Sequence, residues 1–346
     1  MSADVLDSRY SWIRLGISLA VATVANVGIW AVVVVMPALQ AEFGIDRAAA
    51  SIPYVTTMLG FGVGNLVIGR FVDRFGVVAA LIGASVIMSV SYALTAVSGA
   101  IWLVYALHFL IGFGSAAGLA PLLADISHWF ARRRGIAVAL AATGNYLAGA
   151  VWPVALSGLL VDGSWRHVYF ALAGIVLVVM IPLTLCLRRK VPPEAMAHAD
   201  RVSDANRQAV AIPLSVLKWL LAAAGIGCCV AMAMPQVHVV SFAADLGCTP
   251  AVGAQILSVM LLGGVASRIV FGILSDRLGG VKTLIISSLL QAFALSLYLP
   301  LNGVSALFVV SLIFGLSQGG IVPSYAIIVR EYFPARQAGT VIGFVI

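Results

Sequence analysis

The chain has 346 residues, of which 62% are hydrophobic and only 10% are charged, and its mean hydropathy is +1.08. A soluble domain is roughly half apolar and about a quarter charged, so this composition excludes an ordinary soluble protein and indicates a membrane chain. The formal net charge is +7, but no Lys/Arg cluster alternates with exposed aromatic residues, which argues against a nucleic-acid partner.

Ten apolar segments follow one another along the chain, each long enough to cross a hydrocarbon core of about 30 Å. An eleventh begins with "AGTVIGFVI" at residues 338–346. The loops are short except for one polar stretch, which we interpret as a linker between two halves. The predicted domains are an N-terminal six-helix bundle at 1–187, a cytoplasmic linker at 188–212, and a C-terminal bundle at 213–346 with helices 7–10 and the start of helix 11. The ten segments are centred near Gly28, Gly62, Ile87, Gly112, Leu147, Leu177, Gly227, Leu262, Leu290 and Gly315.

Lys and Arg residues fall mainly on one side of these segments. With the N-terminus in the cytoplasm, the basic loops lie inside, and only Arg47 and Arg166 lie in outer loops. We therefore expect a multi-pass protein of the plasma membrane, the inner membrane of a bacterium, with a cytoplasmic N-terminus and lipid around it. No nucleophile-and-base motif, phosphate loop or metal-ligand spacing is present, so the sequence predicts no enzyme, no cofactor and no metal site.

The two halves share an internal repeat. The stretches "GRFVDRFGVV" and "GILSDRLGGV" both contain the pattern G-x-x-x-D-R-x-G and lie 203 residues apart. The first glycine of the pattern allows close helix packing, the Asp and the adjacent Arg form a charged latch at the membrane surface, and the last glycine permits a tight turn. We therefore predict a gating role for both copies. Their residues are Gly69, Asp73, Arg74 and Gly76, and Gly272, Asp276, Arg277 and Gly279.

This repeat resembles the major facilitator superfamily of secondary transporters, whose signature lies between helices 2 and 3. Residues 128–149, "HWFARRRGIAVALAATGNYLAG", resemble the monocarboxylate porter signature, and 234–247, "MPQVHVVSFAADLG", looks like the helix 7 end of bacterial members. The narrower resemblance is to the monocarboxylate porter and oxalate–formate antiporter-like group. It implies an all-α membrane protein of the major facilitator type, with two pseudo-symmetric six-helix bundles. By this resemblance we expect the chain to be truncated after the start of helix 11.

Arg268 is a permanent charge within an apolar stretch. It precedes Asp276 by eight residues, which places it roughly 12 Å from the membrane boundary at about 1.5 Å per residue. An unpaired charge at this depth costs about 3 kcal/mol or more, and no Asp or Glu lies at comparable depth. We therefore predict that Arg268 binds an anionic substrate. The alternative is that it pairs with backbone carbonyls or polar side chains and only fixes helix packing.

The resemblance adds to this prediction, because in monocarboxylate porters an arginine four residues before the helix 8 glycine is implicated in carboxylate binding. Arg268 precedes Gly272 by that spacing. The repeat offset maps Arg268 onto Asn65, so pseudo-two-fold symmetry predicts both on opposing walls of one central cavity. Further candidates for lining this cavity, each with the alternative of merely bridging helices, are Asn26, Trp30, Asn145, Tyr146, Gln318 and Tyr325.

Two histidines lie in predicted spans, His108 in helix 4 and His238 in helix 7. An imidazole titrates near neutral pH, so both are candidates for proton coupling, against the alternative of a hydrogen-bonded structural histidine.

The sequence thus predicts a secondary active transporter that moves a small organic anion, a mono- or dicarboxylate, by alternating access, either with protons or by exchange. Two alternatives stay open, a carrier of another small solute such as a sugar or a cationic drug, and a truncated product that does not transport. The drug carrier is disfavoured, because helix 5 lacks the G-x-x-x-G-P pattern of drug antiporters and no acid lies deep in a span.

Overall fold

The computed structural model describes residues 6–160, 164–208, 212–248, 250–300 and 303–346, and within these ranges it contains helices and no strands. The first half comprises α1 (Arg9–Ala25), α2 (Val27–Phe43), α3 (Arg47–Phe75), α4 (Val77–Ala96), α5 (Ile101–Ser115), η1 (Ala116–Gly118), α6 (Ala120–Trp129), α7 (Arg134–Ala142), α8 (Gly144–Leu160), α9 (Trp165–Ile175), η2 (Val176–Met180) and α10 (Ile181–Leu185). The linker carries α11 (Pro193–Gln208). The second half comprises α12 (Leu214–Asp245), α13 (Pro250–Leu278), α14 (Gly280–Ser296), α15 (Val304–Gln318), α16 (Ile321–Tyr332), η3 (Ala335–Gln337) and α17 (Ala338–Val345).

Nine helical segments among the described residues are long and apolar enough to cross a membrane. Some of them join consecutive helices, such as Arg9–Phe43 from α1 and α2 and Val304–Tyr332 from α15 and α16. The segment predicted near Leu290 forms the shorter apolar helix Gly280–Ser296. The prediction of an all-α, multi-pass membrane protein is therefore confirmed.

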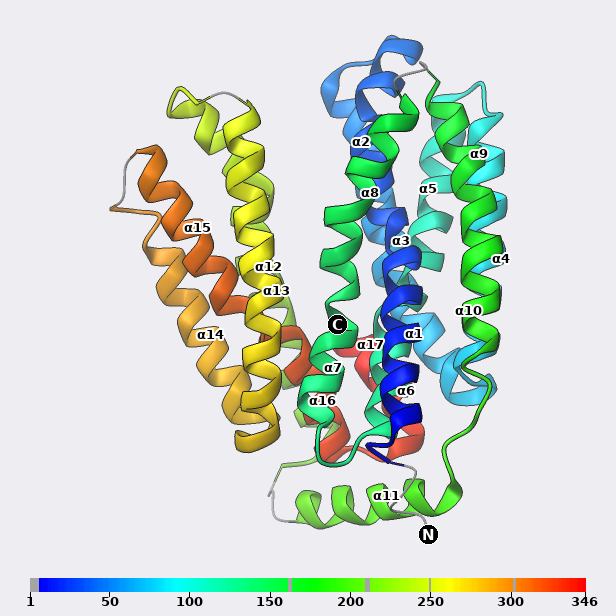
Figure 1. Ribbon diagram of the computed structural model, residues 1–346, viewed down its shortest axis with the longest axis vertical. Coiled ribbons are helices and arrows are strands. Elements are labelled where there is room, and N and C mark those ends of the chain that lie inside the picture. Colours follow the sequence, from blue (N-terminus) through cyan, green and yellow to red (C-terminus); the bar gives the residue numbers. More distant parts are fainter. Residues whose placement is uncertain (1–5, 161–163, 209–211, 249, 301–302) are drawn as a thin grey trace.

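The two halves stand side by side and meet at one end (Figure 1). Helices α1–α10 lie on one side of the view and α12–α15 on the other, while the short helices α16 and α17 lie between them near the bottom. Helix α11 runs across this bottom end. We call this end of the molecule the linker end. The loops at Gly76, 130–133 and Gly279 also lie there, next to α11 or to the residues that contact it. Toward the opposite end, α12, α13 and α15 lie apart from α2 and α8 (Figure 1).

Repeated glycines allow the halves to approach at the linker end. Gly69 on α3 faces Gly339 on α17, and a Cβ placed on Gly339 would lie 2.7 Å from the carbonyl oxygen of Gly69. Gly135 on α7 faces Gly272 on α13, and a Cβ on Gly135 would lie 2.5 Å from the Gly272 carbonyl oxygen. Real Cβ atoms essentially never come within 3.0 Å of a neighbour. Both helix crossings therefore require a residue without a side chain.

The linker contains a helix that the sequence analysis did not predict. Helix α11 docks onto the second half, where the Nδ2 of Asn206 donates to the carbonyl oxygen of Glu331 at 3.1 Å. The backbone N–H of Ala335 donates to the Oδ1 of Asp200 at 2.7 Å. These contacts bring α11 against the same end at which the two helix crossings lie. The domain boundaries at 187 and 213 stay predictions.

Candidate functional site

Arg268 lies in the contact between the two halves and is only 3% exposed. Its Nη1 donates to the carbonyl oxygen of Ala142 in the opposite half. Ala142 is the last residue of α7, where a helix leaves carbonyl oxygens without helical donors. The Nε of Arg268 has no hydrogen-bond partner, and no Asp or Glu forms an ion pair with Arg268, in the part of the chain that the structure describes. The guanidinium is therefore only partly satisfied.

The guanidinium of Arg268 also stacks on an aromatic ring from the opposite half. Its central carbon lies 3.9 Å from the centroid of the Tyr146 ring on α8. Gly264, one turn before Arg268, leaves room for that ring, since a Cβ on Gly264 would lie 2.8 Å from the Tyr146 Cε2. A cation over a desolvated aromatic face is stabilised by about 2 kcal/mol, but it keeps its N–H donors. The structure therefore brings two predicted site residues together and leaves one of the arginine's donors unused.

Asn65 lies at a different contact between the halves. It is 2% exposed, its Nδ2 donates to the carbonyl oxygen of Phe61 at 3.0 Å, and its Oδ1 has no partner among the described residues. The residue of α17 that approaches it is Gly343, where a Cβ would overlap the Asn65 carbonyl oxygen. Asn65 lies at the contact of α3 with α17, and Arg268 at the contact of α13 with α7 and α8. That the two residues form opposing walls of one central cavity stays a prediction.

Two other predicted site residues bridge helices within the first half. The Nε1 of Trp30 on α2 donates to the backbone and side-chain oxygens of Asn145 on α8, at 3.3 and 3.4 Å. The Nδ2 of Asn26 donates to the carbonyl oxygen of Ala22 at 2.7 Å and lies 3.5 Å from that of Gly118. These contacts correspond to the helix-bridging alternative that the sequence left open.

Gln318 and Tyr325 lie within the second half. The Nε2 of Gln236 on α12 donates to the Oε1 of Gln318 on α15 at 3.3 Å, and the Nε2 of Gln318 is buried without a partner among the described residues. The hydroxyl of Tyr325 lies 3.3 Å from the Sγ of Cys228. The sequence reasoning missed Gln236. Its position directly after Pro235 in an apolar helix was the signal that could have identified it.

His108 is buried inside the first half. Its Nδ1 lies 2.7 Å from the carbonyl oxygen of Val104, and its Nε2 lies 2.9 Å from the hydroxyl of Tyr169. Because both ring nitrogens have partners within one half, the geometry favours the structural alternative over proton coupling. His238 is exposed on α12 and borders a largely apolar hollow between α12 and α14.

The two motif aspartates join the halves at the linker end. Asp276 on α13 accepts the backbone N–H groups of Gly135 at 2.5 Å and Ile136 at 3.2 Å, which open helix α7. Asp73 on α3 accepts those of Gly339 at 2.9 Å and Thr340 at 2.7 Å, which open helix α17. A carboxylate at a helix N-terminus meets free N–H donors and the positive end of the helix dipole. Each aspartate therefore fastens the opposite half in the same way.

Among the described residues, these contacts use the aspartate of each motif and not the adjacent arginine, and the gating role of both motifs stays a prediction. Neither Asp73 nor Asp276 forms an ion pair with Arg74 or Arg277 within the described ranges, and both arginines are exposed. Consecutive residues on a helix do not face each other, so only the aspartate points across the contact. The last glycines of the two motifs have positive φ angles, 86° at position 76 and 81° at position 279, as the predicted tight turns require.

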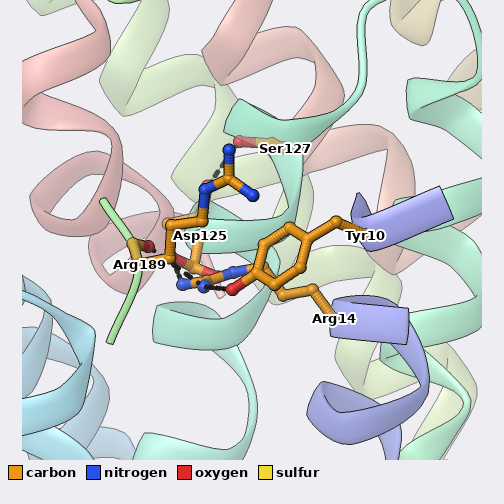
Figure 2. A network of polar contacts seen from close by, with 6 residues as sticks. Tyr10, Arg14, Asp125, Ser127 and Arg189 are labelled. Carbon is orange, nitrogen blue, oxygen red and sulfur yellow. Dashed lines mark hydrogen bonds and ion pairs between the residues drawn. The ribbon is translucent and has the colours of Figure 1, made fainter. Parts of the chain in front are cut away.

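Figure 2 shows a polar network at the linker end that the sequence reasoning missed. Arg14 on α1 is 2% exposed and donates from Nε and Nη2 to the two carboxylate oxygens of Asp125 on α6, both at 2.8 Å. Its Nη1 donates to the Tyr10 hydroxyl at 3.3 Å and to the Arg189 carbonyl oxygen at 3.2 Å. The i, i+4 spacing of Tyr10 and Arg14 was the available signal. The network holds α1, α6 and the segment after α10 together.

The two helical halves thus meet in two equivalent glycine crossings, and one of these contacts contains the buried charge of Arg268. Residues 19–346 match the family model described as "Major Facilitator Superfamily", and the chain belongs to this superfamily of transporters.

Curated relatives fit this assignment. "MFS-type transporter pynF" of Aspergillus niger is 26% identical over 274 residues, which are 79% of this chain and 62% of that protein. "Monocarboxylate transporter 11" of Homo sapiens is 30% identical over 211 residues, which are 59% of this chain and 43% of that protein. The chain thus spans less than two thirds of the length of these two relatives.

Solved structures show the same fold. The proton:xylose symporter XylE superposes with a TM-score of 0.75 at 13% identity, over 97% of this chain and 85% of that one. The transporter FucP in the outward conformation superposes with a TM-score of 0.70 at 15% identity, over 97% of this chain and 89% of that one. The predicted major facilitator fold is therefore confirmed.

Proposed function

We propose that the protein is a secondary active transporter of small organic anions, mono- or dicarboxylates, that works by alternating access in the plasma membrane. The observation that carries this proposal is Arg268, a buried guanidinium with an unused Nε and no acidic partner among the described residues. A substrate carboxylate supplies the missing charge and accepts a charge-assisted hydrogen bond. The Tyr146 ring holds the guanidinium in place for this contact.

The position of Arg268 links substrate binding to the gate. Gly272, which crosses Gly135, lies one helical turn beyond Arg268 on the same helix. A carboxylate that draws the guanidinium away from Ala142 therefore loosens the contact between α13 and α7 directly above the crossing. Helix α13 then takes part both in substrate binding and in opening of the linker end, as alternating access requires.

In this proposal the linker end faces the cytoplasm, as the distribution of Lys and Arg predicts, together with the N-terminus. Among the described residues, hydrogen bonds join the halves at the two aspartate caps of the linker end and at the contact between the Tyr146 hydroxyl and the Met232 sulfur. Such a conformation is closed toward the cytoplasm and accepts substrate from outside. The repeated glycines and aspartates 73 and 276 form the cytoplasmic gate.

A second candidate is a carrier of neutral, hydroxyl-rich solutes. The observation that favours it is the amide pair Gln236–Gln318, in which the Nε2 of Gln318 is an unused donor. Amides donate to and accept from hydroxyl groups, and the structural neighbour XylE is a proton:xylose symporter. This candidate requires no role for Arg268 in recognition.

The test is uptake of labelled lactate, pyruvate, oxalate and xylose by cells that express the protein, across external pH. Arg268→Gln is expected to reduce uptake of the acids about 50-fold, because it removes a charge-assisted hydrogen bond. Arg268→Lys should retain part of the uptake, and Arg47→Gln, which changes an exposed arginine of α3, should retain all of it. The membrane content of each variant is measured by immunoblot.

Two outcomes contradict the proposal. If Arg268→Gln takes up the acids as well as the wild type does, the arginine has no role in substrate recognition. Xylose uptake that is lost in Gln318→Ala but intact in Arg268→Gln establishes the neutral-solute carrier instead.

A further inference from the structure

A second incompletely satisfied arginine lies at the linker end. Arg330 on α16 is 3% exposed, and neither its Nε nor its Nη1 has a hydrogen-bond partner in the described residues. Unpaired donors on a buried cation are strongly unfavourable, because the group has lost its water without gaining an acceptor. Arg330 borders a cavity of about 180 Å³ that it shares with residues of α6, α7 and α11.

The other polar residues that line this cavity are Arg134, His128, Asn206 and the acid Glu331. Arg134 of α7 lines the cavity, and its Nε donates a hydrogen bond to the carbonyl oxygen of Phe130 at 3.1 Å. His128 of α6 lines it with a buried Nδ1 that has no partner among the described residues, and Asn206 of α11 lines it as well. Two guanidinium groups thus face one small space from opposite halves of the molecule.

One acid, Glu331, lines the cavity, and Asp200 lies on the neighbouring helix α11; each has one carboxylate oxygen bonded to a backbone N–H. The Oε1 of Glu331 accepts the backbone N–H of Gly280 at 3.0 Å, at the start of α14. The Oδ1 of Asp200 accepts the N–H of Ala335 at 2.7 Å. No ion pair joins either acid to Arg330 or Arg134 within the ranges that the structure describes. Among the residues that line the cavity, Arg134 and Arg330 carry two positive charges and Glu331 carries one negative charge, so the lining is positive on balance.

We propose that this cavity binds a small phosphate-class oxyanion, which fastens the two halves at the linker end. The planar fork of an arginine matches a phosphate group with two parallel hydrogen bonds, and the volume holds a tetrahedral anion. Arg134 and His128 belong to the first half and Arg330 to the second, so one bound anion bridges both. This site is distinct from Arg268, and it regulates the gate whatever solute the carrier moves.

The effect on the gate follows from the position of Arg134. It directly precedes Gly135, whose N–H is capped by Asp276 and which crosses Gly272. An anion that holds Arg134 against Arg330 therefore strengthens the crossing beside it. The closed state at the linker end then gains stability by RT ln(1 + [anion]/Kd), which grows with the anion concentration. Phosphate on the linker side of the membrane then slows opening toward that side.

The experiment measures thermal unfolding of the purified protein in detergent, with inorganic phosphate or with chloride at equal ionic strength. Phosphate is expected to raise the unfolding midpoint of the wild type by about 2 °C or more over chloride. Arg330→Gln should lose this shift and be no less stable than the wild type without phosphate, because it removes an unpaired charge. Arg336→Gln, an exposed arginine on the adjoining turn, should keep the shift.

Further variants and lipid vesicles test whether the rise in the unfolding midpoint comes from this cavity or from another site. Arg268→Gln should also keep the shift, which distinguishes the cavity from the proposed substrate site. If Arg330→Gln does not fold, Arg134→Gln and Arg330→Lys take its place, and both should weaken the shift. A shift produced by phosphatidylglycerol vesicles but not by soluble phosphate identifies a lipid headgroup as the source of the same oxyanion.

The proposal is overturned by either of two results. One is a wild type that neither inorganic phosphate nor phosphatidylglycerol stabilises relative to chloride or phosphatidylcholine. The other is a phosphate shift that Arg330→Gln, or the replacement variants, show in full.

Discussion

The two glycine crossings between the halves share a backbone design and differ in the charge of the side chain one turn before the crossing. On α3 and α17, Gly69 crosses Gly339 and Asp73 caps the opposite helix, and on α13 and α7, Gly272 crosses Gly135 with Asp276 as the cap. Four residues before the crossing, however, α3 carries the neutral Asn65 and α13 carries the charged Arg268.

This difference separates two functions that the repeat alone cannot distinguish. Glycine crossings and aspartate caps are symmetric, because both halves must be fastened and released at the same end. The recognition of an anion proposed for Arg268 is asymmetric, because one positive charge suffices for one carboxylate and a second would add a desolvation cost. The comparison predicts that gate variants act equally in both contacts, whereas recognition variants do not.

After the loss expected at Arg268, the largest effect should come from bulk at the helix crossings. In Gly135→Val and Gly339→Val, the new side chain meets the backbone of the opposite helix, which prevents closure at the linker end. We expect uptake to fall about tenfold or more in both variants, since overpacking costs about 1–3 kcal/mol. The measurement is initial uptake per inserted molecule.

The matched control for the crossings is Gly62→Val on α3, where nothing lies within 4 Å of the new Cβ. This variant should transport normally. Full activity of Gly135→Val, or a large difference in uptake between the two crossing variants, would contradict the prediction that the two crossings are equivalent.

A smaller and symmetric effect is expected from the aspartate caps. Asp73→Asn and Asp276→Asn each keep the shape of the side chain but remove the charge at a helix N-terminus, which is worth about 1 kcal/mol. The population open at the linker end should rise about fivefold in each, and the two effects should add in the double variant.

Spin labels report this shift directly. Cysteines that replace the exposed Arg132 and Arg277 place labels on opposite halves at the linker end, in a background without the native cysteines. A longer distance population should grow in each aspartate variant. Unchanged distance distributions in both variants contradict the role of the caps.

A modest effect is expected at Asn65. Its Nδ2 is bonded within its own helix, and its free Oδ1 is an acceptor that can bind a substrate hydroxyl but not a carboxylate. Asn65→Ala should therefore raise the apparent KM for the hydroxy acid lactate about two- to threefold and leave kcat unchanged. Concentration-dependent uptake measures both constants. A loss as large as that of Arg268→Gln would show that the two contacts share recognition after all.

The smallest effect on transport is expected at His108. Because both ring nitrogens are bonded within the first half, His108→Gln should lower the free energy of unfolding by about 1–2 kcal/mol and leave the pH profile of uptake unchanged. Thermal unfolding and uptake across external pH test the two statements. A displaced pH profile in this variant, and not in His238→Gln, makes His108 the coupling residue.

The sequence by itself determined the membrane class, the helical fold and the repeat. Hydropathy is a local property, so runs of apolar residues predict spans without knowledge of their neighbours. The turn glycines at 76 and 279 were predictable for the same reason, since a positive φ is a demand of the local backbone. Arg268 was conspicuous because its surroundings along the chain are apolar.

Only the tertiary structure decided which polar side chains interact with each other. Asp73 caps a helix 267 residues further along the chain, and Arg14 binds an acid 111 residues away, distances at which a sequence pattern carries no information about pairing. For the same reason the sequence could not show that each motif aspartate caps a helix of the opposite half. The unpaired donors of Arg330 became visible only when helices from both halves enclosed them, because burial is a property of packing rather than of residue type.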